Sequence, residues 1–236
     1  MRINKYLASC GLCSRREADQ MVADGRVTID GEPAEAGSQV EEGMEVLADG
    51  KPVRAKQEKT YLLLYKPRGI VCTASRQEAD NIIDFLHYPV RLTYAGRLDK
   101  DSEGLMLMTD DGDLIHAVMR AGDLHEKEYE VQVAQKIRRQ DLVEMQGGVF
   151  LEEIGRQTRP CKTRYIGPHT FRITLTEGIN REIRRMCKAY GYRVTKLVRI
   201  RIMNLKLGGL KPGESRLATD TEREELLRLA GRYPEK

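Results

Sequence analysis

The hydrophobic and polar positions near the start of the chain follow the period of an amphipathic helix. Ala18, Met21 and Val22 recur at three- and four-residue spacing and form one apolar stripe. A Ser-x-x-Glu capping box at residues 14–17 precedes the stripe and supplies partners for the first backbone N–H groups. The pattern predicts a helix over residues 15–24, which the following glycine ends.

A shorter helix and a hairpin complete this N-terminal module. Ile3, Tyr6 and Leu7 have helical spacing before the capping box. After the helix, residues 26–29 have the character of a short strand, and Asp30-Gly31 is a pair typical of tight hairpin turns. We therefore expect two helices and a hairpin in the first 48 residues.

The rest of the chain carries patterns that are typical of β-strands. Two segments are continuous apolar runs, as in strands that are buried on both faces, and two others alternate between apolar and polar positions. A further segment after a Pro-Arg-Gly turn is expected to be extended. In chain order, the predicted strands are residues 61–65, 70–73, 105–109, 171–175 and 196–200.

A polar stretch separates the two patterns. Asp49-Gly50 turns the chain, and the residues up to Lys59 contain a proline and have no periodicity. In the second part, a short helix over residues 82–86 is expected, capped by Asp80 or Asn81. The predicted division is a domain at 1–48, a linker at 49–59 and a second domain at 60–236. The expected fold class is α+β, with a mixed α/β second domain built on a mainly antiparallel sheet.

Charge is distributed unevenly along the 236 residues. The 40 basic and 36 acidic side chains give a formal net charge of +4. Residues 156–211 hold 15 basic and only 2 acidic side chains, a net charge of +13, whereas residues 1–50 have a net charge of −5. Because the basic stretch also carries strand patterns, it indicates a folded surface that attracts phosphate. The apolar runs are far shorter than the roughly 18 residues of a membrane span, so no membrane partner is expected.

The five cysteines are odd in number and scattered, which excludes a disulfide framework and favours a reducing, cytoplasmic location. Cys10 and Cys13 form a CxxC pair without the second pair that a zinc site needs, so we interpret them as packing residues. The acids at 99, 101 and 103 resemble the start of a calcium loop, but an apolar run follows where further ligands are required. We therefore expect no metal.

Basic side chains gather on the two predicted N-terminal helices. The order of helix, capping box, helix and hairpin in "RINKYLASCGLCSRREADQMVADGRVTIDG" (residues 2–31) resembles the alpha-L RNA-binding domain, of the S-four type. That resemblance implies that the basic edge of this module contacts RNA. The residues expected to do so are Arg2, Lys5, Arg15 and Arg16.

The most informative motif is a charged loop flanked by glycines, "GRLDKDSEGL", at residues 96–105. It resembles the signature of pseudouridine synthases of the RsuA/RluB/RluE/RluF family. Three further segments agree in order: "YKPRGIVCT" from Tyr65, where Asn is usual, "HEKEYEV" from His125, and "TEGINREIRRMCKAYGY" from Thr176, with Glu182 where Gln is commoner. The run "DNIIDF…GRLDKDSEGL…AGDLHEKEY…RRMC…RIMN" is most similar to the RluF subgroup.

This resemblance implies the isomerisation of a uridine in rRNA to pseudouridine, without cofactor or metal. By family position, Asp99 is the catalytic carboxylate, Tyr129 stacks on the flipped-out base, and Arg184 pairs with Asp99. The residues expected to support them are Arg97, Lys127 and Lys66. Two further arginines, at helical spacing to Arg184, are expected to bind RNA, namely Arg181 and Arg185.

Each implied role has a physical reason. A base inside a helix must be flipped out before an enzyme reaches it, and an aromatic ring then replaces its lost stacking. A carboxylate can attack the anomeric carbon as a nucleophile or act as a base on the ribose, and the sequence leaves both routes open. An adjacent arginine keeps such a carboxylate ionised.

The expected partner is rRNA, as a stem-loop of 23S rRNA or within an assembling ribosomal subunit, and the chain is expected to act as a monomer. Two alternatives stay open at this point. The substrate can be small-subunit rRNA, as for the RsuA subgroup, or the chain can be a non-catalytic RNA-binding or ribosome-assembly protein that keeps the fold.

Overall fold

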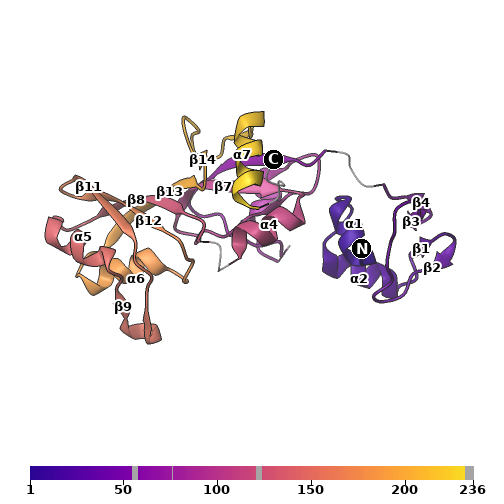
Figure 1. Cartoon of the computed structure of the whole chain (residues 1–236), viewed down its shortest axis with the longest axis horizontal. Coiled ribbons are helices and arrows are strands. Elements are labelled where there is room, and N and C mark those ends of the chain that lie inside the picture. Colours follow the sequence, from indigo (N-terminus) through magenta and orange to yellow (C-terminus); the bar gives the residue numbers. More distant parts are fainter. Residues whose placement is uncertain (55–57, 76, 121–123, 232–236) are drawn as a thin grey trace.

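The computed structural model describes residues 1–54, 58–75, 77–120 and 124–231. The middle of the predicted linker and the start of "AGDLHEKEY" therefore lie outside the described residues. Figure 1 shows a small N-terminal domain set to one side of a larger domain built on a long sheet. The helices are α1 (Ile3–Ser9), α2 (Arg15–Ala23), α3 (Ile82–Leu86), α4 (Gly112–Met119), α5 (Arg139–Gln146), α6 (Glu182–Ala189), α7 (Asp220–Leu229) and the 3₁₀ turn η1 (Glu152–Ile154).

The N-terminal domain has the predicted helices and hairpin. Glu17 N–H donates to Ser14 Oγ at 3.1 Å and Ser14 N–H donates to Glu17 Oε2 at 2.6 Å, so the capping box is confirmed. Ala18, Met21 and Val22 are buried, as their spacing predicts. Four strands form the sheet, in the order β2-β1-β3-β4: β1 (Val27–Ile29), β2 (Glu32–Pro33), β3 (Val46–Ala48) and β4 (Lys51–Pro52).

The N-terminal sheet extends into residues predicted as linker. Asp49 and Gly50 both have positive φ, 50° and 71°, and turn the chain back so that β4 pairs with β3. Val53 packs against the core of this domain, and its carbonyl accepts the Tyr6 hydroxyl at 3.0 Å. The prediction that the linker starts at residue 49 was therefore wrong. The sequence indicated the turn at Asp49-Gly50, but not the strand β4 that follows it.

One nine-stranded sheet organises the second domain. Its main path runs β11-β12-β8-β13-β7-β5-β15, with β14 paired to β13 and β6 paired to β7. These neighbours are antiparallel except β13 and β7, so the mainly antiparallel sheet is confirmed. The strands are β5 (Tyr61–Lys66), β6 (Thr93–Tyr94), β7 (Glu103–Thr109), β8 (Lys127–Val133), β11 (Lys162–Gly167), β12 (Thr170–Leu175), β13 (Val194–Ile202), β14 (Leu205–Lys206) and β15 (Ser215–Leu217), with a separate pair β9 (Phe150–Leu151) and β10 (Arg156–Gln157).

The continuous apolar runs lie in the middle of this sheet and are covered on both faces. In β7, Leu105 and Leu107 point to one core, together with residues of α4 and α7, whereas Met106 and Met108 point to a second core that includes α3. All residues of β5 and β7 are buried. The unbroken apolar runs therefore correspond to strands that are buried on both faces, as predicted.

A third core lies at the other end of the sheet, where α5 and α6 pack on β8 and β12 (Figure 1). The sheet therefore has two halves, joined where β13 lies between β7 and β8. The parallel contact between β13 and β7 consists of two residue pairs, Val198↔Glu103 and Arg199↔Gly104. Tyr129 of β8 packs against a core from each half, which locates the junction of the halves.

Two strand predictions need correction. Residues 70–73 form no strand, because only Val71 makes an isolated bridge, to Asn81. Residues 196–200 do belong to a strand, but Leu197, Val198 and Arg199 are all buried, since β13 is an interior strand with neighbours on both sides. The alternation of β12 is confirmed. No helix of the described residues is long and apolar enough to cross a membrane.

Candidate active site

Asp99 lies on a turn between β6 and β7. Ser102 N–H donates to the Asp99 carbonyl at 3.1 Å and closes the turn, and Gly69 N–H donates to the Lys100 carbonyl at 2.8 Å. Leu98, just before the turn, is 8% exposed and fixes it to the core. The Asp99 side chain is half-buried, and among the described residues it has no ion pair or side-chain hydrogen bond. Backbone hydrogen bonds therefore hold the turn in place, while the Asp99 carboxylate remains open to a substrate.

Lys66 supports this turn from beneath. It ends β5 with 0% exposure, and its Nζ donates to the carbonyls of Pro67 and Ser102, each at 2.8 Å. Burial lowers the pKa of Lys66, while the nearby charges of Asp101 and Asp99 act to raise it. The supporting position predicted for Lys66 thus has a structural basis: it ties the end of β5 to the turn that carries Asp99.

Tyr129 and Lys127 come from β8, the strand that joins the two halves of the sheet. Both are half-buried. Burial lowers the pKa of Lys127, and the Arg199 charge lowers it further. Tyr129 pairs in register with Arg199 of β13, whose strand partner on the other side is Gly104. The tyrosine therefore lies two strands away from the β7 end of the Asp99 loop.

Arg184 pairs with Asp101, not with Asp99 as the resemblance implies. Its Nη2 lies 3.3 Å from Asp101 Oδ2, and it donates to the Asp101 carbonyl at 3.1 Å and to Ser102 Oγ at 3.4 Å. The prediction was wrong in its partner because α6 meets the far side of the turn, two residues beyond Asp99. Arg184 therefore binds the turn rather than the proposed catalytic carboxylate.

Arg181 lies on the same side of the turn. It precedes α6 with a left-handed φ of 54°, and its Nη2 lies 3.2 Å from Asp101 Oδ2. Burial raises the pKa of Asp101, but the hydrogen bond from Arg181 and the charges of Arg184 and Arg181 bring it below its usual value. Arg181, at the N-cap of α6, and Arg184, within α6, thus converge on one carboxylate of the turn.

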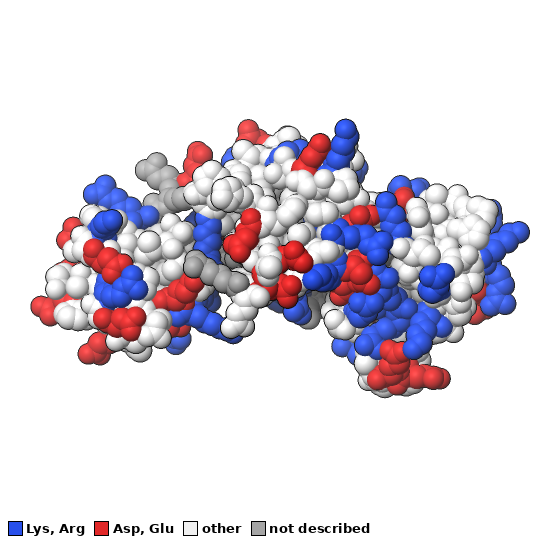
Figure 2. Space-filling model, turned by 180° about the vertical axis from the view of Figure 1, so that it is seen from behind, with Lys and Arg blue, Asp and Glu red and all other residues white. Residues whose placement is uncertain are grey.

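The remaining predicted RNA contacts divide into exposed and paired side chains. Arg2, Arg15 and Arg16 are exposed, and so is Arg97, which the resemblance gives as a supporting residue of the active site. Lys5 Nζ forms an ion pair of 2.6 Å with Asp113 of the second domain. Arg185 pairs with Glu153, and its Nε donates to the Asn180 carbonyl at 3.0 Å. Basic side chains gather over the half of the sheet that carries β8, β11, β12, α5 and α6 (Figure 2).

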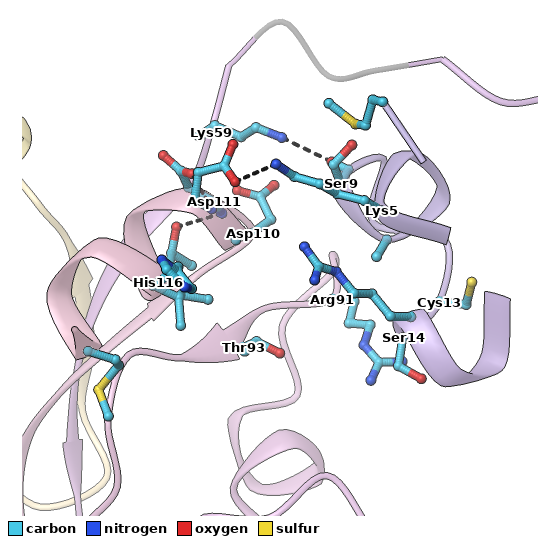
Figure 3. A pocket seen from close by; sticks show the side chains of 18 of the residues that line it. Lys5, Ser9, Cys13, Ser14, Lys59, Arg91, Thr93, Asp110, Asp111 and His116 are labelled. Atoms are coloured by element: carbon cyan, nitrogen blue, oxygen red, sulfur yellow. Dashed lines mark hydrogen bonds and ion pairs between the residues drawn. The ribbon is translucent and has the colours of Figure 1, made fainter. Parts of the chain in front are cut away.

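A cavity of about 1020 Å³ lies between the two domains (Figure 3). Cations from both domains line it, together with three carboxylates at and just before the start of α4, namely Asp110, Asp111 and Asp113. The Lys5–Asp113 pair crosses it, and Lys59 Nζ donates to the Ser9 carbonyl at 3.0 Å. None of the predicted catalytic residues lines this cavity, so we assign it to the contact between domains and not to the reaction.

Comparisons with known proteins agree with this arrangement. Residues 60–189 match the RNA pseudouridylate synthase family and residues 1–46 match the S4 domain. The chain is 45% identical to the dual-specificity RNA pseudouridine synthase RluF of Salmonella typhi, over 97% of this chain and 79% of the relative. It is 32% identical to the ribosomal large subunit pseudouridine synthase B of Bacillus subtilis, over 97% and 96%.

A solved structure of the same kind covers nearly the whole chain. A crystal structure of a pseudouridylate synthase superposes with a TM-score of 0.70 at 30% identity, over 96% of this chain and 99% of that one. The chain belongs to the RNA pseudouridine synthase family. This pseudouridine synthase is accordingly an isomerase, and its first domain is an S4 RNA-binding domain, as the sequence motifs predict.

Sequence reasoning missed two contributors to the synthase site. Asp101 was read only as part of a charged loop, although its spacing of two from Asp99 places it across the turn. Arg199 was interpreted only as a polar position of a half-buried, alternating strand, yet it is 1% exposed. The available signal was its position between the apolar residues Val198 and Ile200 of a predicted strand, since arginine is rarely buried.

Proposed function

We propose that this synthase isomerises a uridine of large-subunit rRNA, with Asp99 as the carboxylate that acts on the nucleotide. The observation that carries the proposal is the state of Asp99: its side chain is half-buried on a turn held by backbone hydrogen bonds, without a side-chain partner among the described residues. The name of the 32% identical relative, a ribosomal large subunit enzyme, supports the choice of substrate.

The reaction breaks the bond between ribose and uracil and joins the same two groups through carbon. Asp99 acts in the first step, either as a nucleophile at the anomeric carbon or as a base on the ribose. Lys66 supports that step by position: its Nζ donates to the carbonyls of Pro67 and Ser102 and so ties the end of β5 to the turn that carries Asp99. Tyr129 stacks on the flipped-out base, in the place of the neighbouring bases of the RNA.

Arg184 acts on Asp99 through the turn. It binds the carboxylate and carbonyl of Asp101 and the hydroxyl of Ser102, so it determines where the turn lies relative to α6. Its contribution is therefore orientation of the carboxylate, a task for which small displacements carry large rate penalties.

RNA is held by the exposed arginines of the S4 domain and by the basic surface of the second domain (Figure 2). Residues 156–211, with a net charge of +13, supply much of that surface. Binding through phosphates releases counterions, so affinity falls steeply as salt rises. An affinity that stays flat between low and physiological salt contradicts this interface.

Release of tritium from rRNA that carries uridine labelled at carbon five tests the role of Asp99. We expect Asp99→Asn to lower the single-turnover rate by about 10³-fold or more. Asp80→Asn is the matched control, because Asp80 is an exposed carboxylate of the same domain that contacts only Lys100 in the described residues. Activity that survives Asp99→Asn rules out the proposed role of the carboxylate.

Mapping pseudouridine in RNA from a deletion strain tests the substrate. Loss of a modified position in large-subunit rRNA is expected, and loss in small-subunit rRNA instead contradicts the proposed target. Because the 45% identical relative is described as dual-specificity, the map includes the smaller RNAs of the cell as well. An unchanged map leaves no catalytic role and favours an RNA-binding or assembly protein.

A further inference from the structure

Arg199 is a buried cation in the interior strand β13, below the Asp99 turn. Its side chain is among the largest that the fold buries, with 1% exposure. Three of its nitrogens have partners: Nε donates to the Leu105 carbonyl at 2.7 Å, Nη1 to the Arg97 carbonyl at 3.4 Å, and Nη2 contacts Met106 Sδ at 2.8 Å. The planar guanidinium is thus committed to backbone and sulfur acceptors.

The two carbonyls that Arg199 binds lie on either side of Asp99. Arg97 precedes the turn, and Leu105 follows it within the buried strand β7. One rigid group therefore spans the segment from 97 to 105, and that segment contains the proposed catalytic carboxylate. A guanidinium is suited to this task because its donors have a fixed geometry, whereas an ammonium is a single point charge.

The backbone of Arg199 is as closely fitted as its side chain. A Cβ at Gly104 would lie 2.4 Å from the Arg199 carbonyl oxygen, and the φ of Gly104 is +113°. Gly96, at the other end of the segment, has a φ of +90°, and a Cβ there would lie 4.0 Å from Arg199 Nη1. Gly104 thus allows the backbone of β7 to approach the backbone of this arginine, whereas at Gly96 the guanidinium lies at an ordinary contact distance and the tight neighbour is Met119 Sδ, at 3.2 Å.

Stability alone gives no reason for a charge at this position. Among the described residues, no carboxylate lies within ion-pair distance of Arg199, and its charge acts against the nearby cations Lys66 and Lys127. An apolar side chain of similar volume usually serves a core as well as a buried charge does. What an apolar side chain lacks is the ability to bind the carbonyls of Arg97 and Leu105 together.

We propose that Arg199 is a positioning residue for catalysis: by binding both ends of the segment that carries Asp99, it holds that carboxylate at the place where the substrate ribose arrives. The inference rests on the proposed function of Asp99. Arg199 itself is buried and does not touch the RNA.

The test compares Arg199→Gln and Arg199→Lys with Arg201→Gln as the matched control. Arg201 lies on the same strand and loses a guanidinium in the same way, but its partners are Glu126, Glu128 and the Met203 carbonyl, away from the turn. Single-turnover tritium release with saturating enzyme gives the rate constant, which does not depend on an inactive fraction of the preparation. RNA affinity and hydrogen exchange of the amides at 98–104 are measured on the same proteins.

We expect Arg199→Gln to lower the single-turnover rate constant by about 100-fold, the size of effect that an ångström of misplacement produces, with an RNA affinity close to that of the control. Arg199→Lys retains the charge but reaches one carbonyl at a time, so we expect an intermediate rate. In both variants the amides at 98–104 exchange faster than in Arg201→Gln. A merely structural role changes global stability without this local difference.

Several outcomes overturn the proposal: a rate constant for Arg199→Gln equal to that of Arg201→Gln, a defect confined to RNA affinity, or unchanged exchange at 98–104. If Arg199→Gln does not fold, Arg199→Lys decides, and a wild-type rate with wild-type exchange contradicts the role. Asp99→Asn separates the two proposals. If Asp99→Asn stays active, the proposed role of Asp99 is wrong. Hydrogen exchange of the amides at 98–104 in Arg199→Lys still shows whether Arg199 holds that segment.

Discussion

Replacement of Gly104 by alanine tests how closely β7 and β13 approach each other beneath the Asp99 turn. Gly104 has a φ of +113°, and a Cβ there would lie 2.4 Å from the Arg199 carbonyl oxygen and 2.6 Å from its nitrogen. Real Cβ atoms essentially never come within 3.0 Å of such atoms, and both of these are backbone, which cannot rotate away. The two strands would have to separate by roughly half an ångström or more.

The expected cost has two parts. Placing a side chain in the left-handed region costs about 1–2 kcal/mol, and forcing an extra carbon into a packed contact costs about 1–3 kcal/mol. We therefore expect Gly104→Ala to lower the free energy of unfolding by about 2–5 kcal/mol, the sum of the two parts. Because the parallel pairing of β13 and β7 consists of two residue pairs, separation at Gly104 disturbs the whole of that contact.

Gly213→Ala is the matched control for this measurement. Its φ is +89°, but the nearest atom to a Cβ is Phe85 Cζ at 3.7 Å, an ordinary contact. This variant is expected to lose only the conformational part, about 1–2 kcal/mol. Urea unfolding followed by far-ultraviolet circular dichroism gives both values, since the chain has no tryptophan for fluorescence. Equal losses in the two variants would refute the close approach of the strands.

Two further perturbations test local features of the fold. Burial and the nearby Glu177 carboxylate raise the pKa of Glu182 to about 7. Between the ordinary pKa of about 4.3 and about 7, Glu182 therefore keeps its proton in the folded state but loses it in the unfolded state. The free energy of unfolding falls as pH rises through this interval. Glu182→Gln should remove this dependence of stability on pH, and denaturant midpoints measured across the same pH range will show it. If the midpoint of the variant falls with pH as steeply as that of the wild type, the assignment to Glu182 is contradicted. Ser14→Ala removes the cap of α2 and should cost the S4 domain about 1 kcal/mol in thermal or urea unfolding, so an unchanged midpoint would mean that the cap contributes nothing.

Much of the local structure could be predicted from neighbouring residues. The capping box at residues 14–17 and the helix after it depend on contacts within one turn, and both are present. The apolar runs at 61–65 and 105–109 are strands covered on both faces, because only such strands tolerate apolar residues at every position. The family motifs are likewise short, continuous segments of sequence, so they identified the enzyme class without the fold.

The strand errors arose where local pattern and sheet position disagree. Residues 70–73 are apolar enough for a strand, but only Val71 finds a bridge partner, and a strand requires a paired neighbour. The pattern of residues 196–200 predicts a half-buried strand, yet β13 lies between β7 and β8, and Leu197, Val198 and Arg199 are all buried. Burial of a strand depends on the order of the whole sheet, and that order is not encoded in any short window.

The partners of the charged residues were decided by the tertiary structure alone. The motif placed Arg184 near Asp99, but its ion pair is with Asp101, and Arg199 binds a carbonyl 94 residues away in sequence. Local patterns therefore determined many of the elements, the family motifs indicated the chemistry, and the charge distribution predicts a basic surface that attracts phosphate. Which carboxylate each arginine contacts depends on sheet register and on how α6 packs against the sheet. A difference of a few ångströms between distant segments determines whether an ion pair forms.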